Sequence, residues 1–263
     1  AEVSERPAVE GVERHRASKK AAQKPRKLAE PAVAAASTAD AAAADDAQSF
    51  EELKLAKPLL KATRELGWER PTPIQARVIP FVLSGADVCA SALTGSGKTA
   101  AFMLPVLERL LQLRRGFRTG ATRVVVLTPT RELAAQVEAM SAQLCQFCEV
   151  RLCLVVGGLS AKLQEAELRE RPDVVVATPG RLIDLMRNSP SVGLEEVEVL
   201  VLDEADRMLD IGFRDEVEEI VRACPTKRQT LLFSATVPKE MQEIASRALR
   251  PGDQQRFVDC VGE

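Results

Sequence analysis

Aromatic residues and long apolar runs are both scarce in this chain. Phe and Trp make up 3% of the 263 residues, and Tyr is absent. Stacking of bases on aromatic rings is therefore not expected to dominate any binding of nucleic acid. No run of about 18 apolar residues occurs, so the sequence predicts neither a membrane-spanning helix nor a membrane partner.

The chain also lacks a strong excess of either charge. It has 36 Lys and Arg against 38 Asp and Glu, which gives a formal net charge of −2. Bulk charge supplies no attraction to nucleic acid, so any such contact needs a local patch. One basic run without intervening acids comprises Arg14, Arg16, Lys19, Lys20, Lys24, Arg26 and Lys27. It is either part of a solvated tail or a nuclear-targeting or RNA-tethering patch.

Histidine and cysteine are too few for a convincing metal framework. Cys145 and Cys148 have the spacing C-x-x-C, but no second pair follows, and the single histidine, His15, is distant in sequence. We expect buried, reduced thiols rather than a zinc site, consistent with a cytoplasmic or nuclear compartment. No secretory signal is visible.

The composition changes sharply near residue 48. Residues 1–47 are rich in Ala, Glu, Lys and Pro and poor in large apolar side chains, so they bury too little surface to offset the entropy of ordering. We predict a disordered, low-complexity segment at 1–47 and one folded domain at 48–263.

Within the folded part, short apolar runs alternate with helical patterns. The predicted strands are 87–91, 123–128, 152–156, 174–177, 199–203 and 230–233. The predicted helices are 100–113, 132–147, 162–169, 181–187 and 216–222, and a further helical pattern follows the last strand at 237–249. Such alternation predicts an α/β fold with a central parallel sheet flanked by helices.

A glycine-rich turn follows the first predicted strand and opens a helix. It consists of Ala92, Leu93, Thr94, Gly95, Ser96, Gly97, Lys98 and Thr99. Backbone N–H groups of such a P-loop turn point inward around phosphates, Lys98 can reach the β- and γ-phosphates, and the Thr99 hydroxyl can ligate Mg²⁺. Ala92 stands where the strict pattern has its first Gly. The turn predicts a nucleoside triphosphate site.

A cluster of carboxylates follows the predicted strand at 199–203. Four apolar residues lead into Asp203, Glu204, Ala205 and Asp206. In open α/β sheets, ligands bind at the carboxyl ends of the strands. Mg²⁺ prefers oxygen ligands and is usually held by one or two carboxylates plus phosphates, so this strand end predicts the metal side of the same site.

These motifs and their neighbours resemble those of the DEAD-box RNA helicases over roughly residues 49–258. Residues 67–75, which read Gly-Trp-Glu-Arg-Pro-Thr-Pro-Ile-Gln, resemble the Q motif, with Phe50 at the upstream aromatic position. Residues 129–133 resemble motif Ia, Gly157 and Gly158 the glycine pair, and residues 178–181 motif Ib. Residues 203–206 are similar to motif II and residues 234–236 to motif III. Trp68 departs mildly from the family, in which Phe is usual.

The resemblance implies a RecA-like P-loop domain that binds ATP and Mg²⁺. It implies that Gln75 reads adenine, that Phe50 packs against the base, and, more weakly, that Arg70 lays its stem along it. Asp203 would hold Mg²⁺ through water, and Glu204 would position and polarise the attacking water. Asp206 would bond Ser234 or Thr236 and so couple motifs II and III. Without the surrounding motif, a single Gln at a helix start, such as Gln75, would ordinarily be a solvated surface residue.

The resemblance also implies binding of the RNA sugar-phosphate backbone, single-stranded or in a short duplex. The implied contact residues follow strand ends and are Pro129, Thr130, Arg131, Gly157, Gly158, Thr178, Pro179, Gly180 and Arg181. Thr130 and Thr178 precede helices and are also candidates for plain helix N-caps, and the two roles can coexist.

The activity implied is RNA-dependent ATP hydrolysis coupled to local duplex unwinding. Members of the family carry a second RecA-like domain with arginine fingers. We expect this chain, which begins with Ala1 and ends soon after motif III, to be a fragment with little activity of its own. A nucleotide-gated RNA clamp or assembly scaffold is an alternative, and a DNA-directed P-loop motor is a third that Asp206, Gln75 and residues 178–181 disfavour.

Within the family, residues 207–210, 156–159 and 50–60 resemble the nucleolar helicases of large-ribosomal-subunit assembly. This likeness implies a role in ribosomal RNA processing or ribosome assembly, a pre-ribosomal particle as partner, and a location in the nucleus, in particular the nucleolus.

Overall fold

The computed structural model describes residues 49–113, 120–236, 239–250 and 254–260. The segment expected to be disordered, 1–47, and its basic run lie outside the described residues. The described strands are β1 (Asp87–Ser91), β2 (Val124–Leu127), β3 (Leu152–Val155), β4 (Val174–Ala177), β5 (Val199–Leu202), β6 (Gln229–Ser234) and β7 (Gln255–Asp259). The helices are α2 (Lys57–Glu65), α3 (Pro73–Leu83), α4 (Lys98–Leu113), α5 (Arg131–Leu144), α6 (Ala161–Arg169), α7 (Pro179–Asn188), α8 (Ala205–Ile211), α9 (Arg214–Ala223) and α10 (Lys239–Ala248).

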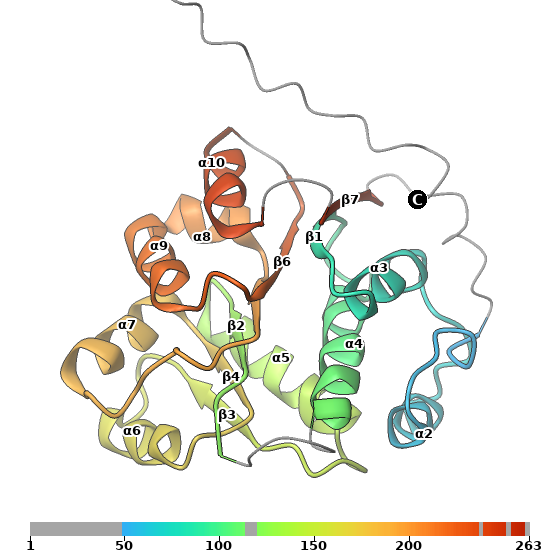
Figure 1. The fold of residues 1–263 in the computed structure, drawn as a ribbon, viewed down its shortest axis with the longest axis horizontal. Coiled ribbons are helices and arrows are strands. Elements are labelled where there is room, and N and C mark those ends of the chain that lie inside the picture. The colour runs from blue at the N-terminus through green and yellow to red at the C-terminus, as the bar shows by residue number, and fades with distance from the viewer. Residues whose placement is uncertain (1–48, 114–119, 237–238, 251–253, 261–263) are drawn as a thin grey trace, which may run out of the picture. The chain divides into compact units, whose positions relative to one another are not determined.

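The strands form one parallel sheet in the order β3-β4-β2-β5-β6-β1-β7. The predicted α/β class and parallel sheet are therefore confirmed, and Figure 1 shows helices packed around the strands. In β2, β4 and β5 every residue is buried, which is why these strands read as uninterrupted apolar runs.

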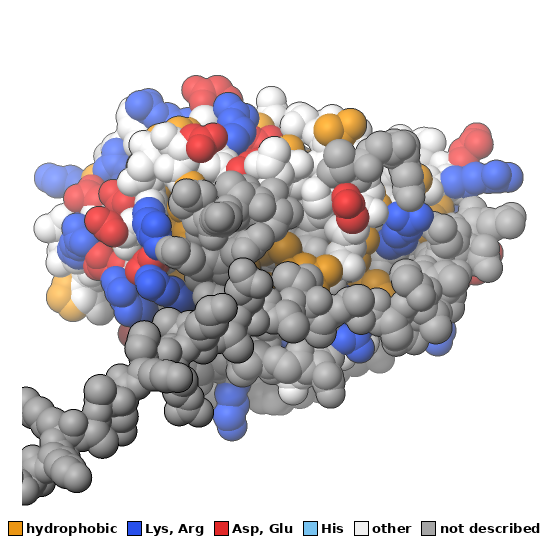
Figure 2. Space-filling model, turned by 90° about the horizontal axis from the view of Figure 1, so that it is seen from above, with side chains coloured by type: hydrophobic (Ala, Val, Ile, Leu, Met, Phe, Trp, Pro, Cys, Tyr) orange, Lys and Arg blue, Asp and Glu red, His pale blue; other side chains and the backbone are white. Residues whose placement is uncertain are grey.

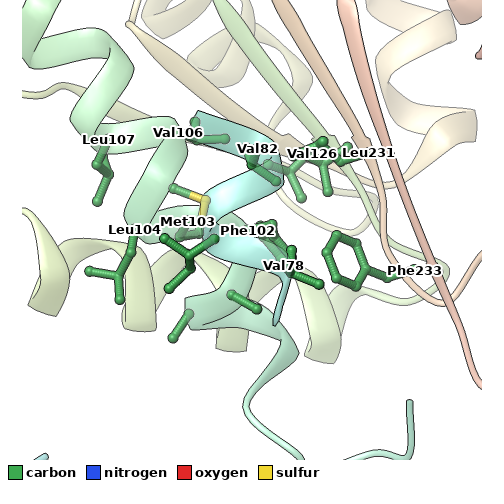
Figure 3. Packing of buried hydrophobic residues seen from close by; sticks show 14 of the residues in the cluster. Val78, Val82, Phe102, Met103, Leu104, Val106, Leu107, Val126, Leu231 and Phe233 are labelled. Atoms are coloured by element: carbon green, nitrogen blue, oxygen red, sulfur yellow. The ribbon is translucent and has the colours of Figure 1, made fainter. Parts of the chain in front are cut away.

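Neighbouring residues of a strand point to opposite faces, so the sheet separates two apolar cores. Val124 and Val126 of β2 belong to the core under α2, α3, α4 and α5. Val125 and Leu127 belong to the other core, with apolar residues of α6 to α10. Figure 3 shows Val78 and Val82 of α3 with residues of α4 and the sheet, in the first core.

The pairing of Phe102 with Phe233 joins the start of α4 to β6 in that first core. Their ring centroids are 5.2 Å apart and tilted by 53°, within the range of favourable aromatic contacts. Both rings are fully buried, so the helix that follows the glycine-rich turn is fixed against the strand that carries motif III.

The sequence patterns missed several elements and misplaced some ends. The edge strand β7 was not predicted, because its residues are mostly half-buried or exposed and give no apolar run. The short helix α8 has too few residues for a clear helical period. The predicted helix 132–147 is too long: α5 ends at Leu144, where Cys148 N donates to Cys145 O in a turn.

Charged side chains of both signs are intermixed on the side of the molecule formed by α7 to α10, at the left in Figures 1 and 2. Glu218 of α9, for example, pairs with Arg214, Arg222 and Arg247. Among the described residues, these positive charges are therefore paired with a carboxylate and are not gathered into a basic patch of the kind that nucleic acid requires. None of the helices in the described ranges combines the length and apolar character needed to cross a membrane.

Candidate active site

The strand order divides the carboxyl edge of the sheet into two halves. The glycine-rich turn follows β1, motif III ends β6, and the carboxylates follow β5, and these three strands are neighbours. The residues implied in RNA contact follow β2, β4 and β3, which are the next three strands. Residues far apart in sequence are thus gathered into two adjacent groups at the edge where ligands bind in such sheets.

The glycine-rich turn connects β1 to α4 as predicted. Gly95 and Gly97 have φ of +85° and +94°, in the left-handed region that favours glycine. Lys98 is the first residue of α4, is buried, and donates from Nζ to Ala92 O over 3.1 Å. The free N–H groups and positive end of α4 make this turn suitable for phosphate.

Gln75 lies against the turn from the first part of α3. Its Oε1 accepts from Thr72 N over 3.0 Å, and its Nε2 donates to Gly97 O over 3.2 Å. A Cβ added at Gly97 would lie 2.5 Å from Gln75 Nε2, so glycine is needed for this close approach. The amide keeps a second N–H and a second lone pair, which are the groups that an adenine edge can use.

Phe50 packs against another aromatic side chain of the protein, which was not expected. Its side chain is 2% exposed, and its ring stacks on Trp68 with centroids 6.2 Å apart. Little of the ring is left for a base, so its packing against adenine stays a prediction. Arg70 is exposed, and its proposed contact with the base likewise stays a prediction.

Asp203 follows β5 with its backbone held by β2. Asp203 N donates to Leu127 O over 2.9 Å, while Oδ1 is buried without a hydrogen-bond partner among the described residues. Burial raises the pKa of Asp203 to about 6, with Lys98 acting in the opposite direction and Glu204 and Asp206 adding to the rise. An unpartnered buried carboxylate oxygen is a suitable ligand for a divalent cation or its water.

The glycine-rich turn also has buried hydroxyl groups that a ligand could bind. The Ser96 and Thr72 hydroxyl oxygens near the turn are buried without a partner within the described part of the chain. No group of three or more His, Cys, Asp and Glu side chains suited to a metal is found among the described residues. Mg²⁺ needs few protein ligands when phosphates and water supply the rest.

Glu204 has an uncommon backbone conformation for a residue with a side chain. Its φ and ψ are 52° and 50°, and it occupies the N-cap position of α8. Its carboxylate is 8% exposed and accepts from Arg207 Nη1 over 2.6 Å. Strained conformations of this kind persist where the surrounding structure holds them and are frequent at active sites.

Asp206 links the start of α8 to the segment after β6. Its Oδ2 accepts from Thr236 Oγ1 over 2.9 Å and from Thr236 N over 3.1 Å. Ser234 Oγ donates to Thr236 O over 2.5 Å. Burial opposes ionisation, but the hydrogen bonds from Thr236 and Ser234 hold the pKa of Asp206 below its ordinary value. The predicted bond between motifs II and III is therefore present.

The second half of the edge begins after β2. Pro129 is buried, and Thr130 is the N-cap of α5, where its Oγ1 accepts from Leu133 N over 3.2 Å. The capping role considered for Thr130 is therefore present and leaves its RNA role a prediction. Arg131 is exposed, and a Cβ added at Gly158 would lie 2.1 Å from its Nη1. The Arg131 guanidinium thus lies directly over the glycine pair.

Motif Ib begins α7 at the end of β4. Thr178 occupies the N-cap position without a side-chain capping bond, and Pro179 is buried in the first turn. Gly180 lies close to Phe213, since an added Cβ would be 3.6 Å from the ring. Arg181 donates from Nη2 to Leu159 O over 3.2 Å, which places it beside the segment that follows the glycine pair.

Two side chains at this edge were missed by sequence reasoning. Arg207 contacts Glu204 from three positions further along α8, a spacing that sequence reasoning could have used. Gln164 of α6 bonds both backbone groups of Val156, just before the glycine pair. No sequence signal pointed to Gln164, because its partner is a backbone segment that only the fold brings near.

The six cysteines are all within the described residues and form no disulfide. Five are buried and Cys148 is half-buried. Burial raises the pKa of Cys89 to about 11 and that of Cys224 to about 12, so these thiols stay protonated at neutral pH and have little nucleophilic character.

Comparison with known proteins places the chain clearly. Residues 72–244 match the family model described as DEAD/DEAH box helicase. The chain is 60% identical over 203 residues to DEAD-box ATP-dependent RNA helicase 28 of Oryza sativa subsp. japonica, covering 77% of this chain and 25% of the relative. It is 54% identical over 211 residues to probable ATP-dependent RNA helicase DDX27 of Homo sapiens, covering 80% and 27%.

The fold has a solved counterpart in a DEAD box protein from the hyperthermophile Methanococcus jannaschii. The match has a TM-score of 0.73 and 37% identity, and covers 81% of this chain and 56% of that one. The chain spans about a quarter of the length of the curated relatives described above.

Proposed function

This chain belongs to the DEAD/DEAH box helicase family, and from that premise we propose that it is the ATP-binding, RecA-like domain of an ATP-dependent RNA helicase. Residues 48–263 would form this domain, and residues 1–47 a separate N-terminal segment. The activity would be RNA-dependent hydrolysis of ATP, coupled to local separation of short RNA duplexes.

One observation carries the proposal: three motifs meet at neighbouring strand ends. The glycine-rich turn follows β1, the carboxylates follow β5, and motif III ends β6 between them. Ala92 N donates to Ser234 O over 3.1 Å, and Asp206 accepts from Thr236. Phosphoryl transfer requires mainly alignment and charge neutralisation, and this arrangement places a lysine, two acidic groups and backbone N–H donors at one edge.

Each residue of the nucleotide half has a distinct proposed role. Residues 92–97 form the turn around the phosphates, with Ala92 N bonded to Ser234 O and other N–H groups of the turn directed to the ligand. Lys98 leaves Ala92 O to bind the β- and γ-phosphates. Gln75 binds the adenine edge with the amide groups that Thr72 and Gly97 leave free, which favours ATP over GTP. Glu204 orients the attacking water and accepts its proton.

Mg²⁺ would be held by Thr99 and, through water, by Asp203. When bound, it would neutralise phosphate charge during transfer. Asp203 fits this role because its Oδ1 is buried and unpartnered among the described residues, and a nearby divalent cation would favour the ionised carboxylate.

The second half of the edge would bind the RNA backbone. Arg131 and Arg181 supply charge, and Gly157, Gly158 and Gly180 allow close approach of a phosphate chain. Thr130 and Thr178 lie at helix N-termini, where backbone N–H groups can also bind phosphate. Binding of this kind does not depend on base sequence.

Turnover would require a second RecA-like domain in the full-length protein. The short length of this chain relative to its relatives leaves room for one. A domain closing on this edge would complete the ATP site and bend the RNA, and phosphate release would allow reopening.

We also propose ribosomal RNA processing or ribosome assembly as the setting, with a pre-ribosomal particle as partner and the nucleolus as location. The support is the likeness of residues 156–159 and 207–210 to the nucleolar branch of the family. The relatives' printed names, DEAD-box ATP-dependent RNA helicase 28 and DDX27, are compatible with this setting.

The test is ATP hydrolysis by the full-length protein with and without single-stranded RNA. We expect strong stimulation by RNA in the wild type and in the exposed-site controls Lys227→Ala and Glu170→Gln. Stimulated turnover should be lost in Lys98→Ala, which cannot bind the phosphates, and in Glu204→Gln, which cannot accept the proton. RNA binding without stimulation in the wild type would contradict the helicase proposal and favour a nucleotide-gated clamp.

A further inference from the structure

The segment that carries the glycine pair leaves the open edge of the sheet. Among the described strands, β3 pairs only with β4 and lies at an edge of the sheet. Thr178 N donates to Val155 O over 3.0 Å, so the polar groups of Val155 face the neighbouring strand. Successive residues of a strand direct these groups to opposite sides. The N–H and C=O of Val156 therefore face away from β4, on the side where the described part of the chain has no strand.

Gln164 supplies the missing partner for Val156. Val156 N donates to Gln164 Oε1 over 2.9 Å, and Gln164 Nε2 donates to Val156 O over 3.0 Å. A primary amide has one acceptor and one donor side by side, so it bonds both groups of one residue as a neighbouring strand would. Gln164 is 3% exposed, and this pairing fixes Val156 to α6.

The backbone immediately after Val156 runs past two arginine side chains. Gly158 has φ of +82° and lies beneath the Arg131 guanidinium. One residue further, Leu159 O accepts from Arg181 Nη2. The segment 156–159 is thus held by Gln164 at its start and contacted by two arginines along its length. Of these three side chains, Gln164 is the one that is both uncharged and buried.

We propose that Gln164 is a positioning residue for RNA binding. By pairing with Val156, it fixes the backbone of Gly157 and Gly158 in a position where an RNA phosphate can contact both that backbone and Arg131. Gln164 does not touch the RNA. The inference rests on the proposed function, because it assigns the glycine pair to the RNA interface.

The test compares Gln164→Met with Gln143→Met in the full-length protein. Met keeps the length of the side chain and removes both hydrogen bonds, and Gln143 is an exposed residue of α5 that provides a matched control. Three quantities are measured: affinity for single-stranded RNA, affinity for ATP without RNA, and amide hydrogen exchange at residues 156–158.

We expect Gln164→Met to weaken RNA binding about tenfold. A change of this size corresponds to the net contribution of about one hydrogen bond. ATP affinity should stay within about twofold of the wild type, since the nucleotide half of the edge is formed by other strands. Amide exchange at residues 156–158 should become faster, because the local opening is no longer opposed by the clamp. Gln143→Met should match the wild type in all three.

Two results would overturn the inference. Unchanged RNA affinity in a folded Gln164→Met variant would show that the clamp does not set the interface. An equal loss of ATP and RNA affinity would show that Gln164 serves only general stability. Failure of the wild type itself to bind RNA is a separate outcome that contradicts the proposed function, and the wild-type measurement identifies it first.

Discussion

At the level of single residues, Asp203 combines a proposed role at the metal site with a cost to stability. Its carboxylate is buried, one oxygen has no partner among the described residues, and burial raises its pKa to about 6. Above both the folded and the unfolded pKa, the ionised form is therefore less favourable in the folded protein than in the unfolded chain. Binding sites commonly retain such unfavourable groups because the ligand compensates them.

We predict that Asp203→Asn raises the free energy of unfolding of the nucleotide-free protein by roughly 1–3 kcal/mol at pH 7. The same change should abolish stabilisation by Mg²⁺ and ATP, because the cation loses its carboxylate. Thermal unfolding with and without the ligands measures both effects. Asp210→Asn, at an exposed residue of α8, should change neither. A less stable Asp203→Asn protein would mean that the attraction between Asp203 and Lys98 outweighs the cost of burying the carboxylate.

Two glycines of the turn permit a second comparison. Gly95 and Gly97 both have φ in the left-handed region, but a Cβ at Gly95 would meet nothing within 4 Å, whereas one at Gly97 would meet Gln75 and Thr72. Gly95→Ala should destabilise the protein by about 1 kcal/mol through backbone strain alone. Gly97→Ala should cost roughly 1–3 kcal/mol more, because Gln75 must move. Denaturant unfolding checks the difference, and equal losses would show that Gln75 moves freely.

Among the secondary-structure elements, α8 connects the two halves of the edge. It begins beside Glu204, its Asp206 accepts from Thr236 after β6, and Phe213 beyond its end lies against Gly180 in α7. A displacement of motif III can therefore reach motif Ib through one short helix. This is a contiguous set of contacts, and coupling through it requires a functional test.

Thr236→Val provides that test, because it removes the hydroxyl that bonds Asp206 while keeping the size of the side chain. We expect stability to fall by about 1 kcal/mol. ATP binding and RNA binding measured separately should change little, while stimulation of hydrolysis by RNA should fall markedly. Thr236→Ser, which keeps the hydroxyl, should behave like the wild type. Full stimulation in Thr236→Val would exclude this bond from the coupling.

An ion pair between buried Asp87 and half-buried Arg250 fixes the start of β1. Asp87 is fully buried and accepts from Arg250 Nε over 2.9 Å, Arg250 Nη2 over 2.7 Å and Thr230 N over 3.1 Å. We predict that Arg250→Met lowers the free energy of unfolding by about 3 kcal/mol, because the Asp87 charge loses its partner. The exposed pair Arg64–Glu51 offers a control, since Arg64→Met should cost less than about 1 kcal/mol. Equal losses in denaturant unfolding would contradict this account.

The sequence predicted those elements whose residues all have the same surroundings, such as strands that are buried on both faces. The four buried residues of β2 and of β5 form apolar runs that only a doubly covered strand explains, and the turn at residues 92–99 has its own composition. β7 was missed because an edge strand needs no such run. The burial of Phe50 against Trp68 was also missed, because a family motif names a residue without showing which neighbours cover it.

At the level of the whole molecule, the order of the strands decides what the edge can do. In sequence, the residues proposed to bind nucleotide and those proposed to contact RNA are interleaved. The turn after β1 comes first, the proposed RNA contacts follow β2, β3 and β4, and the carboxylates come after β5. In the sheet they separate into β5-β6-β1 and β3-β4-β2. Local patterns carry no information on this order, because it depends on which strands pair across long intervals of chain.

This separation predicts that the two halves bind independently within this domain. β1 and β2 are three strand positions apart, which is about 14 Å at the usual spacing between strands. Changes at that distance are normally additive.

In this chain alone, Lys98→Ala should weaken ATP binding by about tenfold or more and leave RNA affinity unchanged. Arg131→Met should weaken RNA binding and leave ATP affinity unchanged. The double variant should lose as much ATP affinity as Lys98→Ala and as much RNA affinity as Arg131→Met. Titration of each ligand in the absence of the other measures both losses. Because an independent pair of sites cannot by itself link hydrolysis to RNA, additivity here would favour a link through the proposed second domain. Strong non-additivity would instead locate the coupling within this sheet.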